Sequence, residues 1–329
     1  MKNRVALCCT SIYPDSEILI ENINNWKFGE HFIAMDLKSS KHGDVKRSGY
    51  LGANREAKSI YEKSCPHNSY SRKNIAFIEA AKKHEFIFET DDDNLILDFS
   101  VFEDPGKNFY IKKVNVYANG QNIFSEIYNL KSQAIWARGY PLPRLNEIFP
   151  GPTNETIKPT VVQFLVDGNP DVDAIIRMVS GADIDIKASQ EVLPIAIKEQ
   201  FHPFNSQATL WRASDLHLMY LPSTCSFRMT DIYRGYIAEK IIFSRQEGVL
   251  FEKAIVRQER NQHDITSDFY AELDGYKDVP TVLEVLNACD IESMNEKDAI
   301  YKCYESLTVA GIFQKNELSL LSNYLESIT

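Results

Sequence analysis

Three consecutive aspartates, Asp91, Asp92 and Asp93, are the residues of this sequence best suited to chemistry. The apolar run 86–88 precedes them and predicts a buried strand, and ligands of an open parallel sheet bind where such strands end. If the strand continues, Asp91 and Asp93 share a face and point at one cation, while Asp92 points away and is assigned to the nucleotide. Carboxylates that leave room for phosphate oxygens hold Mg²⁺ or Mn²⁺ on nucleotides. The alternative is a solvated acidic turn.

A polar tract, 66–74, prepares the strand that leads to these aspartates. Ser71 is predicted to cap a helix with an apolar face over 75–81. Arg72 and Lys73 then fall in its first turn, where the helix dipole disfavours cations. A phosphate at the helix N-terminus would relieve that conflict, so we expect Arg72 and Lys73 to contact the nucleotide. The alternative is two solvated basic residues.

The start of the chain predicts the sheet that carries this site. Apolar runs at 4–9 and 31–35 flank a segment, 18–26, with the apolar spacing of a helix. Strand, helix, strand is typical of a parallel sheet. Thr10 and Asp36 end the two strands and are therefore further nucleotide-binding candidates.

Later polar segments supply candidates for binding a sugar. The loop 138–144 is stiffened by glycine and prolines and carries arginines suited to a diphosphate or a carboxylate. An acidic turn, 167–173, follows a buried strand, and the tract 203–211 sets amides beside a tryptophan. A stiff loop, a helix cap and a core tryptophan are the respective alternatives. The candidate sugar- or acceptor-binding residues are Arg138, Asp167, Asp171, Asp173, Asn205, Gln207, Trp211 and Arg228.

Asp231 precedes a predicted helix over 232–242. The helix dipole favours a carboxylate there, so capping alone can explain it. A carboxylate at the mouth of a pocket can also act as a general base. Both interpretations stay open from the residues alone.

Length and composition bear on the partners, the location and the domain organisation of the protein. The chain has 329 residues, 44% of them hydrophobic, and a formal net charge of -10, which disfavours nucleic acid as the main partner. Six cysteines show no zinc-ligand spacing, and no apolar stretch approaches a membrane span, so a cytoplasmic location is expected. We expect one main domain over 1–244 and a mostly helical C-terminal region over 245–329, with 258–268 as its most linker-like part.

Six motifs resemble, in order, those of the STELLO glycosyltransferases. They run through about the first three quarters of the chain, and the C-terminal quarter carries none that we identify. The resemblance implies a GT-A fold, an α/β architecture with a Rossmann-like nucleotide-binding half and an acceptor half in one mixed sheet. It also implies a DxD motif that holds Mn²⁺ or Mg²⁺ against a nucleotide-sugar diphosphate. The motifs are 69–75 (SYSRKNI), 90–94 (TDDDN), 138–142 (RGYPL), 167–175 (DGNPDVDAI), 203–209 (PFNSQAT) and 231–238 (DIYRGYIA).

The sequence departs from the family at a few positions. Residues 76–78 read Ala-Phe-Ile where the family tends to have Gly-Tyr-Leu, and Glu89 stands where Asp is common. The membrane-anchored N-terminal region of the plant members has no counterpart, so we expect a microbial enzyme of surface-glycan assembly, with at most peripheral membrane contact. More distantly, the DDD strand is similar to that of the reversibly glycosylated polypeptides, which act as UDP-arabinopyranose mutases.

The expected function is a metal-dependent hexosyl- or pentosyltransferase of polysaccharide biosynthesis. Asp91 and Asp93 would hold the cation on the diphosphate of a nucleotide sugar, with a UDP-sugar as the expected donor. Asp231 would take a proton from a hydroxyl of a glycan or lipid-linked glycan acceptor, which makes the reaction inverting. A nucleotide-sugar mutase and a non-catalytic assembly protein that keeps the fold are the alternatives.

Overall fold

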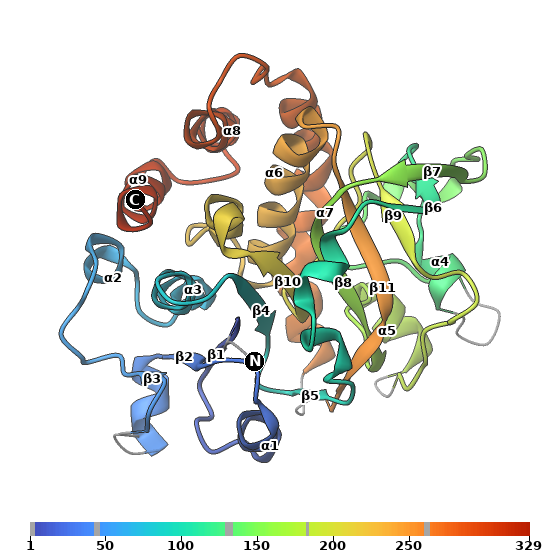
Figure 1. Ribbon diagram of the computed structural model, residues 1–329. Helices are drawn as coiled ribbons and strands as arrows, with labels where there is room; N and C mark the ends of the chain where they lie inside the picture. The colour runs from blue at the N-terminus through green and yellow to red at the C-terminus, as the bar shows by residue number, and fades with distance from the viewer. Residues whose placement is uncertain (1–3, 43–46, 129–133, 182–183, 260–263) are drawn as a thin grey trace.

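The computed structural model describes residues 4–42, 47–128, 134–181, 184–259 and 264–329. One mixed sheet runs through the described chain, with helices on both of its faces (Figure 1). The strands are β1 (Val5–Ser11), β2 (His31–Met35), β3 (Tyr50–Leu51), β4 (Phe86–Thr90), β5 (Asn94–Ile96), β6 (Lys112–Tyr117), β7 (Thr153–Ile157), β8 (Pro159–Gly168), β9 (Ile195–Ile197), β10 (Ala208–Arg212) and β11 (Gly248–Gln258). The helices are α1 (Glu17–Asn25), α2 (Ile60–Ser64), α3 (Lys73–Ala81), α4 (Phe124–Ile127), α5 (Ala174–Ser180), α6 (Thr230–Ser244), α7 (Ile265–Ala288), α8 (Glu296–Val309) and α9 (Glu317–Ser327).

The sheet joins two halves of different character. Its strand order is β3-β2-β1-β4-β10-β8-β11-β9-β6-β7, and β5 pairs with β11 beside this path. The first four strands are parallel, as the strand–helix–strand pattern predicted. From β10 onward antiparallel and parallel pairs alternate. Strand β10 is antiparallel to both β4 and β8, and β11 is parallel to β8. The expected architecture, a Rossmann-like half continued into a second half by one mixed sheet, is confirmed.

Apolar side chains cover both faces of the parallel half. Along β1, Ala6 and Cys8 pack into one core cluster, whereas Val5 and Leu7 pack into the other. This division follows from the strand's period of two, which sends successive side chains to opposite faces. A strand buried on both faces needs the nearly continuous apolar run seen in this sequence.

The C-terminal region, 245–329, contributes a strand to the same sheet as the rest of the chain. Strand β11 lies in the middle of the sheet next to β8, so the region predicted to be mostly helical also supplies a central strand. Gln258, placed in the predicted linker, is the last residue of β11, and α7 begins at Ile265; of that segment, 260–263 lie outside the described residues. The domain boundary at 244 and 245 stays a prediction.

Helices α8 and α9 pack beside α6 and α2, respectively, on the face that also carries α3 (Figure 1). The buried carboxylate of Glu317, at the start of α9, accepts hydrogen bonds from the Tyr220 hydroxyl (2.5 Å) and from the backbone N–H groups of Ser223 and Thr224. The Ser223 hydroxyl in turn donates to Ser71 (2.7 Å), directly before α3. The last helix is thereby tied to the segment that precedes the aspartates. Over the described residues, no helix is both long and apolar enough to cross a membrane.

Candidate active site

A pocket of about 450 Å³ opens at the carboxyl ends of β1, β2 and β4. Its size is typical of small-molecule sites. It gathers side chains from segments far apart in the sequence, as expected for the ligand edge of a parallel sheet. The residues that line it are Thr10, Ser11, Ile12, Tyr13, Asp36, Lys38, Asn68, Ser69, Tyr70, Asp91, Asp92, Asp93, Arg138, Asp171, Gln207, Phe227, Arg228 and Gln258.

The three aspartates all face this pocket, but not through strand alternation. Strand β4 ends at Thr90, and Asp92 and Asp93 form a tight turn before β5 begins at Asn94. The expectation that Asp92 points away from its neighbours is therefore wrong, because a turn does not impose the period of a strand. The turn gathers three carboxylates at one edge of the pocket.

Each aspartate is held by a different partner. One oxygen of Asp91 accepts hydrogen bonds from the Lys73 ammonium (2.6 Å) and the Tyr70 hydroxyl (2.7 Å). Asp92 accepts from the Ser11 hydroxyl (2.5 Å). Asp93 accepts from the Gln258 side-chain amide (2.8 Å), so the end of β11 supports the turn from the far side. These contacts fix the carboxylates before any ligand arrives.

The donor set fits a hard divalent cation. Burial raises the pKa of Asp92 to about 7, with the Ser11 hydroxyl opposing the rise and the charges of Asp93 and Asp91 adding to it. Repulsion among these carboxylates is relieved when a cation joins them. Among the described residues, no group of three or more His, Cys, Asp or Glu side chains is arranged to hold a metal alone. A site of one or two carboxylates completed by phosphate oxygens and water needs no such group.

Lys73 lies beneath the aspartates instead of in the pocket. Its ammonium group is fully buried and contacts Asp91 and the Tyr70 hydroxyl, both at 2.6 Å. Burial alone would lower the pKa of Lys73, but Asp91 and then Glu89 raise it above its ordinary value, so it stays charged. The sequence predicted that an anion compensates this cation at the start of α3, and the structure supplies a carboxylate where a phosphate was expected.

Arg72 is likewise turned inward. Its Nε donates to the backbone carbonyl of Met35 at the end of β2 (2.9 Å), and its guanidinium lies 4.0 Å from Asp36. The cap predicted at Ser71 is also wrong. Ser69 caps the short 3-10 turn Tyr70–Arg72 by accepting from the Ser71 N–H, and α3 follows that turn without a side-chain cap. Nucleotide contacts for Arg72 and Lys73 stay predictions, and neither residue lines the pocket.

Thr10 and Asp36 do line the pocket at the ends of β1 and β2. The Thr10 hydroxyl donates to the Ala34 carbonyl (2.9 Å), which joins the two strand ends. Asp36 accepts from the backbone N–H groups of Leu37 (2.6 Å) and Ser69 (3.1 Å). Both predicted nucleotide-binding residues thus have a fixed place at the pocket wall.

Arg138 lines the same pocket and pairs with two carboxylates. Its guanidinium forms a forked pair with Asp171, with N···O distances of 2.9 and 2.6 Å, and a second pair with Asp231 at 3.0 and 3.1 Å. Although burial disfavours a charged guanidinium, Asp171 and Asp231 keep the pKa of Arg138 above its usual range. Burial likewise opposes ionisation of Asp171, yet Arg138 holds the pKa of Asp171 below its ordinary value. Both partners therefore stay charged at neutral pH.

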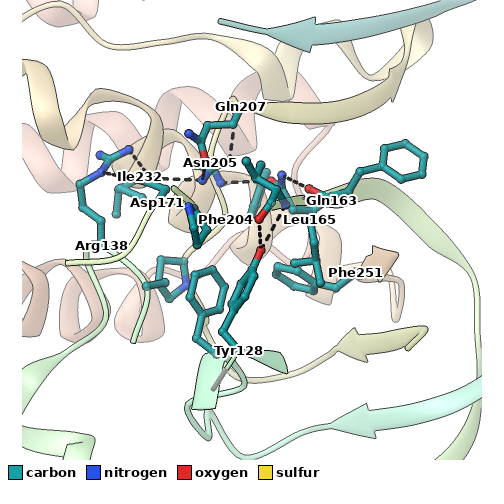
Figure 2. A pocket seen from close by; sticks show the side chains of 16 residues that line it. Tyr128, Arg138, Gln163, Leu165, Asp171, Phe204, Asn205, Gln207, Ile232 and Phe251 are labelled. Carbon is teal, nitrogen blue, oxygen red and sulfur yellow. Dashed lines mark hydrogen bonds and ion pairs between the residues drawn. The ribbon is translucent and has the colours of Figure 1, made fainter. Parts of the chain in front are cut away.

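A small internal cavity lies behind Arg138, and its lining is drawn in Figure 2. Its volume of about 20 Å³ is enough for roughly one water molecule. Arg138, Asp171 and Gln207 line both this cavity and the large pocket, so they form part of the wall between the two. Asn205 braces that wall from inside, because its amide donates to Asp171 (3.1 Å) and to Gln207 (3.3 Å).

Arg228 lines the pocket close to this wall. It donates to Glu272 of α7 (2.8 Å) and lies 3.7 Å from Asp171. Three of the other predicted sugar-binding residues are elsewhere. Asp173 is a buried N-cap of α5. Asp167, on β8, accepts a hydrogen bond from the backbone N–H of Ala188. The fully buried Trp211 donates to Glu89 within the core.

Asp231 does not line the large pocket. Its carboxylate lies behind Arg138, which contacts both oxygens, and it also accepts from the backbone N–H of Ser206 (3.2 Å). A general base must reach the proton that it takes. Its assignment as the base stays a prediction, with the added condition that Arg138 must move aside first.

Several lining residues were not predicted. Ser11 ends β1 and Tyr13 follows it, so strand-end position alone could have found these two, whereas Tyr70 stands in the polar tract before α3. Phe227 contacts the Tyr70 ring edge-on, with centroids 5.5 Å apart. Gln258 carried no local signal, because only the pairing of β11 with β5 and β8 brings it to Asp93.

Comparison with known proteins finds sequence similarity to one group of glycosyltransferases. The family model of the STELLO glycosyltransferases matches residues 228–329. "Probable glycosyltransferase STELLO2" of Arabidopsis thaliana is 24% identical over 228 residues, which are 62% of this chain and 29% of that protein. "Probable glycosyltransferase STELLO1" of the same plant is 23% identical over 257 residues, 70% of this chain and 32% of that protein.

These matches cover part of each protein. This chain spans about a third of the length of these relatives. The model match covers α6 to α9 and so includes the C-terminal quarter, in which we identified no motif from the sequence. That quarter contains strand β11 and the tie made by Glu317, both of which support the site. In sequence the chain is therefore similar to the STELLO glycosyltransferases, the family that its six motifs resemble.

Proposed function

We propose that this protein is a metal-dependent glycosyltransferase that moves a sugar from a nucleotide-sugar donor, with a UDP-sugar as the first candidate, to a glycan hydroxyl. The observation that carries the proposal is the convergence of Asp91, Asp92 and Asp93 on one pocket at the carboxyl ends of β1, β2 and β4. The kinship with glycosyltransferases favours a nucleotide sugar as the ligand of that pocket.

The residues proposed to bind the donor form two groups, one for the nucleoside and one for the metal ion on the diphosphate. Thr10 and Asp36, at the ends of β1 and β2, would contact the nucleoside, while Asp91 and Asp93 would hold Mn²⁺ or Mg²⁺. When bound, such an ion neutralises the charge that develops on the diphosphate leaving group. Lys73 keeps Asp91 in place from below, and Gln258 does the same for Asp93.

The same pocket is also lined by Arg138, Asp171, Gln207 and Arg228, which would receive the transferred sugar and the acceptor. Their charges are paired within the protein, so they can offer donors and acceptors to sugar hydroxyls without demanding a charged ligand. If Asp231 is the base, transfer inverts the anomeric configuration. Asp231→Asn should then bind donor normally and turn over more slowly by at least about a hundredfold.

Product analysis tests the proposal against its main competitor. The protein is incubated with a panel of nucleotide sugars, with and without Mn²⁺, and the nucleotides are separated by anion-exchange chromatography. A transferase releases nucleoside diphosphate from one donor in a metal-dependent manner, by transfer or by slow hydrolysis. A mutase instead yields an isomeric nucleotide sugar without releasing nucleoside diphosphate, and a non-catalytic protein changes none of the panel.

A further inference from the structure

A second hollow lies on the other side of the loop that carries Arg138. We call it the side pocket; it measures about 380 Å³, within the range of small-molecule sites. None of its residues belongs to the proposed donor site. The residues that line it are Gln121, Asn122, Ser125, Ala134, Trp136, Tyr140, Arg144, Leu145, Asn146, Glu147 and Phe149.

The lining combines aromatic rings with uncharged polar groups. Trp136, Tyr140 and Phe149 supply the rings, and Gln121 and Asn146 supply amides. Ring faces pack on the C–H faces of a sugar, and amides match its hydroxyls, so this composition fits a saccharide. A purely apolar ligand would leave the amides without partners, which costs free energy on burial.

The charges of the side pocket cancel within the protein. Arg144 donates to Glu147 (3.1 Å) and to the Asn119 carbonyl (2.8 Å), and its guanidinium lies over the Phe149 ring at 4.9 Å. A phosphate or carboxylate ligand would have to compete with Glu147 for this arginine. The arrangement therefore favours a neutral ligand.

Within the part of the chain that the structure describes, one buried acceptor in the lining has no partner. The side-chain oxygen of Gln121 has almost no accessible surface and accepts no hydrogen bond from the described residues, while its amide nitrogen donates to Glu126 (3.3 Å). Leaving such an atom unpaired costs about 1–3 kcal/mol, which a ligand hydroxyl would recover by donating to it once the side chain turns its oxygen toward the pocket. The Asn122 side chain, by contrast, already donates to the Ile135 carbonyl and accepts from the Phe124 N–H.

The side pocket and the large pocket share one rigid loop. Arg138 faces the large pocket, whereas Trp136 and Tyr140, two residues to either side, face the side pocket. The loop is pinned because the Tyr140 hydroxyl donates to Gly120 (2.9 Å) and Tyr236 donates to Gly139 (2.7 Å). A ligand of several units can therefore cross a single loop and occupy both hollows.

We propose that the side pocket binds neutral sugar units of an oligosaccharide acceptor, remote from the unit that receives the transferred sugar. This inference rests on the proposed function for its biological meaning, but its binding chemistry does not require a nucleotide or a metal. It implies a preference for acceptors of several units over monosaccharides.

Direct binding tests the proposal. Wild-type protein is applied to a printed array of neutral oligosaccharides of three to six units, and hits are titrated while tryptophan fluorescence is recorded. Of the three tryptophans, Trp26 and Trp211 are buried in the core, so a spectral change reports on Trp136. Phe149→Ala and Gln121→Leu should each weaken binding at least tenfold.

Ile148→Ala is the matched control, because Ile148 neighbours Phe149, is 99% exposed and does not line the side pocket; its binding should equal wild type. Circular dichroism checks that each variant is folded, and two variants with different chemistry guard against one that is not. The proposal would be overturned if no oligosaccharide bound, or if binding survived both substitutions. A response to peptides on the same array, without any to oligosaccharides, would overturn it too. Nucleotide-sugar binding, measured separately, would be unaffected by that failure.

Discussion

The buried ion pair between Arg234 of α6 and Glu89 of β4 gives a prediction whose magnitude follows from the structure. Both side chains are at most 1% exposed, and the guanidinium forms two hydrogen bonds with the carboxylate at 3.1 and 2.9 Å. Arg234→Met removes the cation that pairs with Glu89 and leaves this buried carboxylate without its guanidinium partner. Breaking a buried pair in this way costs about 3–5 kcal/mol, so the free energy of unfolding should fall by that amount.

Urea unfolding followed by circular dichroism measures this loss. The double variant Arg234→Met/Glu89→Gln removes both charges and keeps an amide oxygen for the Trp211 indole N–H, which donates to Glu89 at 3.1 Å. It should therefore be more stable than Arg234→Met alone by about 2 kcal/mol or more.

Arg257→Met is the matched control, because Arg257 pairs with Asp185 at the surface, where the side chains are 33% and 68% exposed. Its effect should stay within about 1 kcal/mol. A loss below about 1 kcal/mol in Arg234→Met, or a double variant no more stable than the single one, would refute the reasoning.

Three further predictions concern other parts of the molecule. Burial, with the neighbouring Glu272 charge, raises the pKa of Asp173 to about 7, so the protonated group contributes fully to stability below about pH 4 and this contribution is lost as the pH rises through 7. Urea unfolding across this range should show Asp173→Asn gaining stability relative to wild type by up to about 4 kcal/mol. The same pH dependence of unfolding free energy in both proteins would contradict this. Glu317→Gln should lower the free energy of unfolding by about 2 kcal/mol, since an amide cannot accept all the hydrogen bonds of the carboxylate, and an unchanged urea midpoint would speak against it. Arg138→Lys keeps the charge but loses the fork between two carboxylates, so kcat/KM for donor hydrolysis should fall at least about tenfold; wild-type kinetics would show that the fork is dispensable.

Sequence reasoning located the sheet edge that carries the large pocket, because its signals are local. Apolar runs predicted β1, β2 and β4, and parallel pairing necessarily brings their carboxyl ends together. Thr10, Asp36 and Asp91 therefore meet at one pocket, as expected from position alone. The same argument would have reached Ser11 had it considered every polar residue at a strand end, but not Tyr70, which precedes helix α3.

What sequence reasoning missed depends on contacts between distant segments. Whether Lys73 faces a phosphate or Asp91 is decided by the packing of α3 under β4, which no spacing reveals. Asp231 looks like an exposed cap at the start of α6, yet Arg138, far away in the sequence, covers it. Gln258 seemed part of a linker because its role follows only from the pairing of β11.

The central claim is that the aspartates hold a cation on a nucleotide sugar, and isothermal titration calorimetry tests it most directly. Wild-type protein is titrated with nucleoside diphosphates and nucleotide sugars, with and without Mn²⁺, beside Asp91→Ala, Asp93→Ala and the control Asp98→Ala. Asp98 pairs with Lys253 outside the large pocket, so this control should bind as wild type does. We predict metal-dependent binding of one nucleotide class that weakens at least tenfold in Asp91→Ala and in Asp93→Ala. Binding that is indifferent to the metal, or that persists in both variants, would contradict the account.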